Sequence, residues 1–248
     1  MNILLSGFGG FMGREVIKLA DANYMGANVV CGVDAFFKGE SNVPCFNSFN
    51  DVNVKCDLII DFSFHTVVKE LLDYAVKNNI PTVIATTGHT DEEKAIIKDA
   101  STKIPVFFAA NYSIGVSLLV NLAKITAKTM VGADIEIIEA HHNRKVDAPS
   151  GTALMIYEGI KEVLPSSFKV EGRSGASKRQ AGEIGIHALR MGNVVGEHQV
   201  IVATNNQTIT LKHEAHNRAL FAEGAIVAGE FLLKQGAGLY GMKDLLKD

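Results

Sequence analysis

Residues 2–13 indicate the fold of the first half of the chain. They read Asn2-Ile3-Leu4-Leu5-Ser6-Gly7-Phe8-Gly9-Gly10-Phe11-Met12-Gly13. A short apolar run of this kind is typical of a strand that is buried on both faces of a parallel sheet. It leads directly into a glycine cluster, and a helical pattern follows over residues 13–22. Because glycine permits the tight turn between a buried strand and a helix, the stretch predicts a strand, a turn and a helix in succession.

The same alternation continues along the first half of the chain. Further apolar runs, rich in β-branched and aromatic residues, lie at 29–33, 58–61, 82–85 and 105–109, with helical patterns at 65–78 and 91–100. Residues 35–56 are less regular and predict a loop with short elements. Strands that alternate with helices predict a doubly wound, Rossmann-like parallel sheet with right-handed crossovers.

The pattern changes after about residue 112. Helices are expected at 113–129 and after Ser150, and strands at 134–140, 184–191, 194–204 and 208–214, with a polar stretch at 171–182. Gly192-Asn193 and Asn205-Asn206-Gln207 stand at two of the joins and predict hairpin turns. We therefore expect a second α+β domain at 113–218 with a mixed, largely antiparallel sheet. The helical pattern at 220–234 returns the chain to the first domain, which comprises 1–112 and 219–248.

Composition excludes several classes of protein. Apolar residues make up 47% of the 248 residues and charged residues 21%, which is ordinary globular usage. The net charge of −3 argues against a dedicated nucleic-acid binder, whose surface would be basic. Cys31, Cys45 and Cys56 form no CxxC pair, so we expect reduced thiols rather than a disulfide framework or a zinc knuckle. Neither a signal peptide nor a membrane-spanning run is evident, so we expect a cytoplasmic protein.

The glycine cluster predicts a nucleotide site. Glycines let the backbone approach a pyrophosphate, and the N-terminus of the following helix favours that anion. The strict G-x-G-x-x-G pattern is not met, because Met12 takes the third position and Gly13 follows it, and an ordinary strand-to-helix turn is the alternative. Asp34 ends the second predicted strand, about 20 residues on, where a carboxylate can accept hydrogen bonds from a ribose. We therefore favour dinucleotide binding.

A second cluster lies in the other half of the chain. Residues 139–152 read Glu139-Ala140-His141-His142-Asn143-Arg144-Lys145-Val146-Asp147-Ala148-Pro149-Ser150-Gly151-Thr152. Two imidazoles, a guanidinium and an ammonium stand within five residues, and Ser150 is a good helix N-cap. A cationic cluster beside a helix N-terminus suits a carboxylate or a phosphate. A histidine here can act as a general acid near neutral pH, and Lys145 can donate a proton.

A metal site, a serine nucleophile and a solvated basic loop are the alternatives for this run. Zinc could use both histidines and Asp147, but adjacent residues of an extended segment point to opposite faces, so no metal is expected. Ser150 lacks the G-x-S-x-G elbow of a nucleophile and is better explained as a cap. A solvated basic loop would account for Asn143 and Arg144. It would not explain why the run ends at a helix start that favours anions.

The run at 139–153 closely resembles the signature of dihydrodipicolinate reductases, also called 4-hydroxy-tetrahydrodipicolinate reductases. The likeness extends over essentially the whole chain, including residues 7–13, 85–88, 109–112, 182–185 and 195–198. The resemblance implies a cytoplasmic homotetramer that reduces a cyclic dicarboxylate imine with NADH or NADPH, on the diaminopimelate route to lysine. It implies His141 as proton donor or acceptor and Lys145 as proton donor, with His142, Gly151 and Thr152 binding the substrate carboxylates. The implied dinucleotide-binding residues are Gly7, Phe8, Gly9, Gly10, Phe11, Met12, Asp34, Ala85, Thr86, Thr87, Ala109, Ala110, Asn111 and Tyr112.

Two departures from the family pattern bear on the cofactor. The family often carries Arg where this chain has Phe11, and a basic residue after the acidic strand end where this chain has Ala35. A 2′-phosphate beside Asp34 would therefore lack a fixed counter-ion, with Lys38 the nearest candidate downstream. We expect NADH to be used at least as well as NADPH.

A semialdehyde-type dehydrogenase and a redox-sensing dinucleotide binder are the two rival functions. A semialdehyde-type dehydrogenase would need a cysteine nucleophile in the second half, but all three cysteines lie within the first 56 residues. A redox-sensing dinucleotide binder without turnover would give no role to residues 141–152. In the reductase interpretation, domain closure brings the nicotinamide and the substrate together and excludes water.

Overall fold

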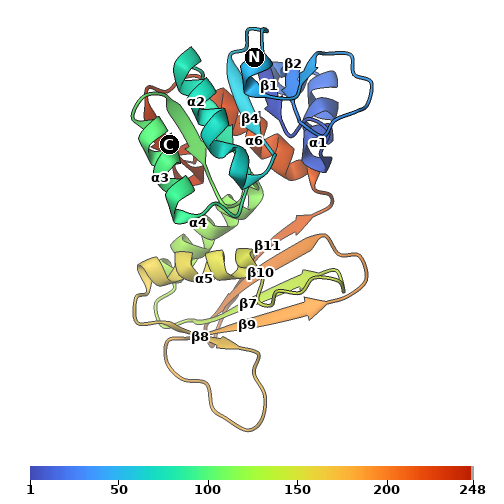
Figure 1. The fold of residues 1–248 in the computed structure, drawn as a ribbon. Coiled ribbons are helices and arrows are strands. Elements are labelled where there is room, and N and C mark those ends of the chain that lie inside the picture. Colours follow the sequence, from blue (N-terminus) through green and yellow to red (C-terminus); the bar gives the residue numbers. More distant parts are fainter. Residues whose placement is uncertain (247–248) are drawn as a thin grey trace. The chain divides into compact units, whose positions relative to one another are not determined.

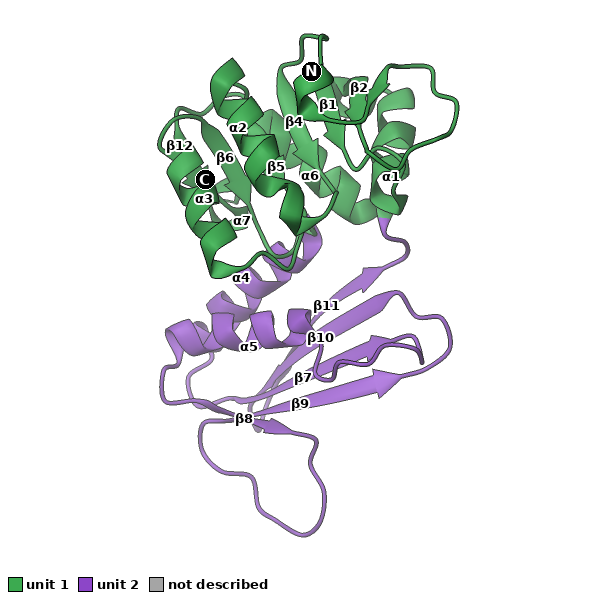
Figure 2. Ribbon diagram, in the orientation of Figure 1, with its two compact units in different colours: residues 1–113, 219–248 green, residues 114–218 purple. Residues whose placement is uncertain are grey.

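The computed structural model describes residues 1–246, and these form two compact units. Unit 1 comprises residues 1–113 together with the segment that begins at residue 219 (Figure 2). Unit 2 comprises Ile114–Arg218. No helix among residues 1–246 is both long enough and apolar enough to cross a bilayer.

Unit 1 is built on a parallel sheet with the strand order β12-β6-β5-β4-β1-β2-β3. The strands are β1 (Asn2–Ser6), β2 (Asn28–Val33), β3 (Cys45–Phe46), β4 (Leu58–Asp61), β5 (Thr82–Ile84), β6 (Pro105–Phe108) and β12 (Gly238–Tyr240). The helices are α1 (Phe11–Asp21), α2 (Val68–Asn78), α3 (Asp91–Ser101), α6 (Ala219–Leu232) and α7 (Met242–Leu245), with short 3₁₀ turns at Tyr24–Gly26, Phe49–Asp51 and His65–Val67. The predicted Rossmann-like architecture is therefore confirmed.

Successive side chains of the buried strands point alternately into two hydrophobic cores, one on each face of the sheet. Ile3 and Leu5 of β1 face the core that contains residues of α1 and α6, whereas Leu4 faces the core that contains residues of α2 and α3. Figure 1 shows these helix pairs on the two faces of the sheet. A strand buried on both faces reads as a continuous apolar run, which is the pattern that residues 2–6 carry.

The start of the first helix differs from the prediction. Helix α1 begins at Phe11 rather than at Gly13, so Phe11 and Met12 belong to its first turn. Gly10 is the N-cap without a side-chain hydrogen bond. Polar capping residues usually mark a helix start, and this turn has glycine there, so the sequence carries no boundary signal at this position.

Unit 2 contains a mixed sheet with helices on one face. The strands are β7 (Asp134–His141), β8 (Phe168–Glu171), β9 (Glu183–Arg190), β10 (Gly196–Ala203) and β11 (Thr208–Ala215), in the order β11-β10-β7-β9-β8. Helices α4 (Ile114–Thr129) and α5 (Gly151–Val163) pack on the face that carries Ile135 and Ile137 (Figure 1).

One predicted hairpin of unit 2 is wrong. Gly192-Asn193 does not join paired strands, because β7 lies between β9 and β10. Strand β10 pairs antiparallel with β7 and β11, whereas β9 pairs parallel with β7 and β8. The sheet is mixed, as predicted, but parallel pairs take a larger share than "largely antiparallel" implied. The hairpin at 205–207 is confirmed, and β8 was not predicted.

Candidate active site

The glycine turn of unit 1 has the close backbone approaches that require glycine. Gly7 has φ +78°, and a Cβ at this position would lie 2.4 Å from the Phe62 carbonyl oxygen. A Cβ at Gly13 would lie 2.3 Å from the carbonyl oxygen of Gly7 and 2.7 Å from that of Phe8. Both Gly7 and Gly13 are therefore required to be glycine. The turn leads directly into α1, and the N-terminus of that helix favours an anion.

Asp34 is tied directly to the glycine turn. Its Oδ2 accepts a hydrogen bond from the Gly9 N–H at 2.8 Å, and its Oδ1 accepts one from the Phe36 N–H at 2.9 Å. Each carboxylate oxygen has capacity for a further donor. The structure thus brings together two predicted parts of a nucleotide site that stand 25 residues apart in the sequence.

A cleft of about 200 Å³ lies beside these residues. It is lined by Gly7, Gly10 and Asp34 and by two exposed rings, Phe36 and Phe64, of which 80% and 66% are exposed. Exposed aromatic rings beside a backbone turn are well suited to stack on a planar base. The sequence prediction missed both rings, since an isolated phenylalanine in a loop carries no periodic signal. The cleft and the glycine turn together fit the adenosine part of a dinucleotide.

The other predicted cofactor residues lie at strand ends, with differing exposure. Phe8 is buried in contact with Phe37, while Phe11 is exposed and Met12 half-buried. After β5, Ala85 and Thr86 are buried and Thr87 is exposed; after β6, Ala109 and Asn111 are half-buried and Ala110 is exposed. Tyr112 is buried, and its hydroxyl donates to the Ile84 carbonyl at 2.8 Å. The Tyr112 ring therefore braces neighbouring strands rather than pointing outward.

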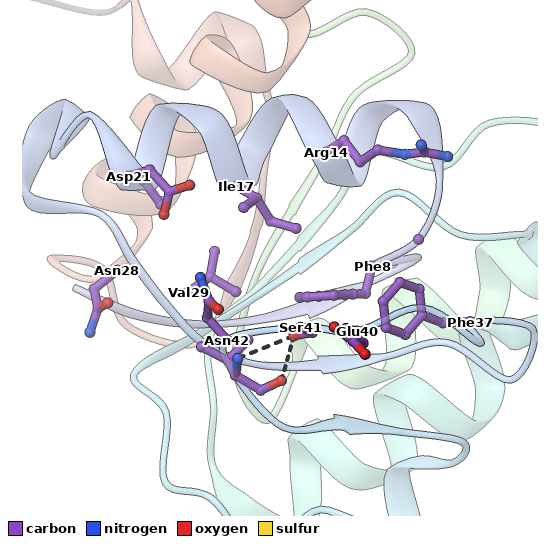
Figure 3. A pocket seen from close by; sticks show the side chains of 13 residues that line it. Phe8, Arg14, Ile17, Asp21, Asn28, Val29, Phe37, Glu40, Ser41 and Asn42 are labelled. Carbon is purple, nitrogen blue, oxygen red and sulfur yellow. Dashed lines mark hydrogen bonds between the residues drawn. The ribbon is translucent and has the colours of Figure 1, made fainter.

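A larger groove of about 670 Å³ lies between α1 and the loop residues 37–43 (Figure 3). Phe8 and Phe37 form part of its wall, and Arg14 and Asp21 of α1 project along it. It shares Phe8 and Gly9 with the turn but is separate from the strand ends named above. In parallel α/β sheets ligands bind beyond the carboxyl ends of the strands, so the smaller cleft is the better candidate for a nucleotide.

Charged side chains of unit 2 lie close together where the buried face of β7 ends. Ile135, Ile137, Glu139 and His141 alternate along β7 and share the face that the helices cover. Glu139 is fully buried, and its Oε2 lies 2.5 Å from His141 Nδ1. The apolar stripe therefore ends in a carboxylate and an imidazole.

Neighbouring strands complete this cluster. Arg190 of β9 donates from Nη1 to Glu139 Oε2 at 2.9 Å and from Nη2 to Oε1 at 2.8 Å. The N–H of Ser150 donates to Glu139 Oε1 at 3.0 Å, and Ser150 Oγ lies 3.1 Å from Nε2 of His198 on β10. The rings of His141 and His198 meet edge to face, with centroids 5.2 Å apart. We call Glu139, His141, Ser150, Arg190 and His198 the β7 cluster.

The cluster strongly shifts two ionisation equilibria. Burial alone would raise the pKa of Glu139, but hydrogen bonds from His141, Arg190 and the Ser150 N–H lower it to about 2. Burial, with the nearby His141, lowers the pKa of His198 to about 4. At neutral pH the cluster therefore holds an ionised carboxylate and a neutral His198.

The segment after β7 places the other predicted residues. Lys145 Nζ pairs with Asp147 Oδ1 at 2.7 Å; 22% of the Lys145 side chain is exposed and 58% of that of Asp147. Ser150 caps α5, its Oγ accepting from the Ala153 N–H at 3.2 Å, as predicted. Gly151, in the first turn of α5, is exposed, and a Cβ there would meet nothing within 4 Å. Thr152 follows it and is half-buried.

A metal ion is a poor fit to the β7 cluster. Glu139, His141 and His198 offer ligand atoms that lie within 4.8 Å of one another. Both oxygens of Glu139, however, already accept from the Arg190 guanidinium. A divalent cation would have to displace that guanidinium, because two cations around one buried carboxylate repel each other.

Comparison with known proteins agrees with these observations. A profile for the N-terminal part of dihydrodipicolinate reductases matches residues 1–112, and a profile for the C-terminal part matches residues 115–246. The chain belongs to the dihydrodipicolinate reductase family. The predicted family resemblance is thereby confirmed over the chain.

Individual relatives in this family are similar over their full length. The 4-hydroxy-tetrahydrodipicolinate reductase of Caldanaerobacter subterraneus subsp. tengcongensis is 45% identical over 249 residues, covering 100% of this chain and 98% of that protein. The same enzyme of Clostridium novyi is 42% identical over 248 residues, covering 99% and 98%. A dipicolinate-bound dihydrodipicolinate reductase from Paenisporosarcina sp. TG-14 has a TM-score of 0.82 at 27% identity, covering 99% of each chain. A myo-inositol dehydrogenase from Corynebacterium glutamicum, at 16% identity and a TM-score of 0.61 over 96% of this chain and 90% of that one, shares the fold.

Sequence reasoning assigned no role to three residues of the β7 cluster. Glu139 belongs to the family signature, and a charged residue on the buried face of a predicted strand is itself a signal for a functional role. Arg190 and His198 enter the cluster through strand pairing, since Arg190 is opposite His141 and His198 is opposite Glu139. The wrong hairpin at Gly192-Asn193 hid this pairing.

Proposed function

We propose that this chain reduces 4-hydroxy-tetrahydrodipicolinate to tetrahydrodipicolinate with NADH or NADPH, in the diaminopimelate route of lysine biosynthesis. The observation that carries the proposal is the end of β7, where His141 leads into a cationic segment that stops at the start of α5. Membership in the dihydrodipicolinate reductase family supports the same reaction. A relative of known structure binds dipicolinate, which is a cyclic dicarboxylate.

In this proposal the substrate carboxylates lie at the start of α5. The first turn of a helix presents N–H groups and a dipole that favour an anion, and the exposed Gly151 leaves the backbone accessible there. Thr152 adds a hydroxyl. Burial, and then the nearby cations Arg144 and Arg218, lower the pKa of His142, so its ring is neutral at neutral pH and can donate one hydrogen bond.

His141 and Lys145 supply the proton that the reduced substrate needs. Lys145 is held by an exposed carboxylate, and such surface pairs contribute about 0–1 kcal/mol, so a substrate carboxylate can compete with Asp147 for the ammonium. His141 is largely enclosed, with 12% of its side chain exposed, and it delivers a proton from a fixed position. When bound, the reduced nicotinamide supplies a hydride to the conjugated imine carbon.

The dinucleotide is assigned to unit 1. The glycine turn, Gly7 to Met12, holds the pyrophosphate against the start of α1, and Asp34 accepts from the ribose hydroxyls. Phe36 and Phe64 offer stacking surfaces for the adenine. Two segments at strand ends hold the nicotinamide half. They are Ala85, Thr86 and Thr87 after β5, and Ala109, Ala110, Asn111 and Tyr112 after β6.

NADH should serve at least as well as NADPH. A 2′-phosphate beside Asp34 would place like charges together, and the positions of Phe11 and Ala35 supply no cation. Lys38 is exposed and is the nearest downstream candidate. Arg14 lines the larger groove beside α1 instead.

The sheet of unit 2 suggests how copies of the chain associate. Its outer face, which α4 and α5 leave uncovered, carries the apolar side chains of Ile138, Leu189 and Ile201, and 47% of Leu189 is exposed. Apolar groups on an uncovered sheet face favour self-association. We propose a homotetramer that works in the cytoplasm, where the nicotinamide pool supplies the reductant.

A single assay tests the proposed reaction. NADH oxidation is followed by absorbance while the cyclic imine is generated in solution, with the imine left out as the control. Oxidation that depends on the imine supports a reductase. Binding of NADH without imine-dependent oxidation would instead favour a redox-sensing dinucleotide binder.

A further inference from the structure

Glu139 is a fully buried carboxylate that accepts hydrogen bonds from a guanidinium and a backbone N–H and also faces an imidazole nitrogen. His141 Nδ1 lies 2.5 Å from Oε2, Arg190 reaches both oxygens, and the Ser150 N–H reaches Oε1. The guanidinium and the backbone N–H can only donate. The bidentate guanidinium and the backbone N–H, together with the His141 ring, lower the pKa of Glu139 to about 2, so the carboxylate is ionised at neutral pH.

An ionised Glu139 dictates how His141 carries its protons. A carboxylate accepts hydrogen bonds only, so the Nδ1 atom that faces it must carry a hydrogen. The proton that His141 gains and loses is then on Nε2, at the opposite side of the ring. Nε2 lies over Gly196, where a Cβ would be only 3.2 Å away, and glycine leaves space for that edge of the ring.

We propose that Glu139 is a positioning residue: it fixes the His141 ring with hydrogen on Nδ1, so that Nε2 holds and releases the reaction's proton. The inference rests on the proton-donor role of His141 in the proposed function. It extends that role by assigning an atom and by giving the reason why a buried carboxylate ends the apolar stripe of β7.

The same carboxylate links the proton donor to the carboxylate-binding segment. Its Oε1 holds the Ser150 N–H just before α5 begins. Arg190, its partner, also donates from Nη2 to the Asp147 carbonyl oxygen at 2.6 Å. Glu139 and Arg190 therefore set the position of His141 relative to the first turn of α5.

The other charges around His141 fix the sign of its pH response. Glu139 is a negative charge beside the ring, and Arg190 is a positive charge bound to that carboxylate. Lys145 and His142 follow on the same segment; Lys145 is paired with Asp147, and His142 has a lowered pKa. His198, facing the ring from β10, has its pKa lowered to about 4 by burial and remains neutral. Glu139 and Arg190 are therefore the two charged members of the β7 cluster beside His141.

Unit 2 contains a matched control for Glu139. On the opposite face of β7, Glu136 accepts a hydrogen bond from Arg179 and lies 2.8 Å from His187 Nε2. It is thus also a glutamate held by an arginine and a histidine, but 29% of its side chain is exposed and it lies away from the β7 cluster. Glu136→Gln makes the same chemical change without touching His141.

The first test is the pH dependence of turnover in the full-length enzyme. A proton donor must be protonated, so activity falls on the high-pH side. Glu139→Gln should lower kcat about 10²-fold or more, with a smaller change in KM, and move the high-pH limb to lower pH, because a negative charge beside the ring is removed. Arg190→Gln should move that limb up, and Glu136→Gln should leave it in place. A purely structural role would lower activity in the variants without shifts of opposite sign, and that result would overturn the proposal.

The second test needs no turnover. In ¹⁵N-histidine spectra recorded where the rings are neutral, the His141 signals, identified by their loss in His141→Gln, should show a hydrogen-bearing Nδ1 and a bare Nε2. Glu139→Gln should reverse or mix these states, whereas Glu136→Gln should not. An unchanged tautomer in Glu139→Gln would overturn the inference. If the wild type failed to oxidise NADH with the imine, the proposed function would fall, while these spectra would still decide what Glu139 does.

Discussion

Gly13→Ala should damage the nucleotide site through the backbone of the glycine turn. The added Cβ would lie 2.3 Å from the Gly7 carbonyl oxygen and 2.7 Å from the Phe8 carbonyl oxygen. Both are backbone atoms and cannot rotate away, so the turn or the start of α1 must shift. Alanine is favoured over glycine inside a helix by about 1 kcal/mol, whereas overpacking of this kind costs about 1–3 kcal/mol or more.

The expected net effect is a loss of stability of roughly 1–2 kcal/mol and a larger loss of cofactor binding. Moving the turn withdraws its N–H groups from the pyrophosphate, so the Kd for NADH should rise at least about tenfold, or roughly 1.4 kcal/mol. Urea unfolding measures the first quantity, and titration of NADH fluorescence measures the second.

Gly236→Ala is the control for this experiment. Gly236 is exposed in unit 1, and a Cβ there would meet nothing within 4 Å. It should leave both quantities close to those of the wild type. If Gly13→Ala bound NADH within twofold of the wild type, the pyrophosphate would not lie on the glycine turn.

Four further predictions concern turnover, substrate binding, cofactor preference and stability. His141→Gln and Lys145→Ala should each lower kcat by about 10²–10⁴-fold while leaving the NADH Kd nearly unchanged, because both residues belong to unit 2 and not to the glycine turn of unit 1. Near-normal turnover in both would remove their assignment. Thr152→Val should raise the substrate KM and weaken inhibition by pyridine-2,6-dicarboxylate, and unchanged inhibition would place the anion elsewhere. The ratio of kcat/KM for NADH and NADPH at physiological salt should not favour NADPH by more than about tenfold, since Asp34 opposes a 2′-phosphate. The pKa of Glu139 is about 2 in the folded chain against 4.5 for a free side chain, so its stabilising contribution is present above pH 4.5 and is lost as the pH falls toward 2. Urea unfolding across that range should show a steeper loss for the wild type than for Glu139→Gln.

Unit 1 was the easier part of the chain to predict, because its signals are local. The run Asn2–Ser6, the glycine turn and α1 follow one another directly, and strands buried on both faces leave continuous apolar runs. The start of α1 was misplaced because glycine at the N-cap gives no side-chain signal. The exposed rings of the cleft were missed because Phe36 and Phe64 lie in loops, where no periodicity applies.

Unit 2 was harder to predict because its sheet is assembled by long-range pairing. A glycine-asparagine pair between two strands ordinarily indicates a hairpin, but here β7, from about 50 residues earlier, inserts between β9 and β10. The residues of the cationic run were visible in the sequence, whereas their partners Arg190 and His198 depend on register. Local patterns therefore predicted which residues could react, and only the pairing of the strands revealed what holds them.

The residues of the proposed site are held in two ways, by strand pairing or by an ion pair on a loop, and these differ in rigidity. His141, Arg190 and His198 are carried by paired strands whose apolar neighbours belong to one core, so their positions are fixed by the packing of unit 2. Lys145 lies on the segment between β7 and α5 and is held by an exposed ion pair, which a substrate carboxylate can replace. A proton donor benefits from a fixed ring, whereas a residue that meets a charged substrate must exchange one partner for another. The division of these tasks between strand and loop follows from where each residue falls in the sequence of unit 2.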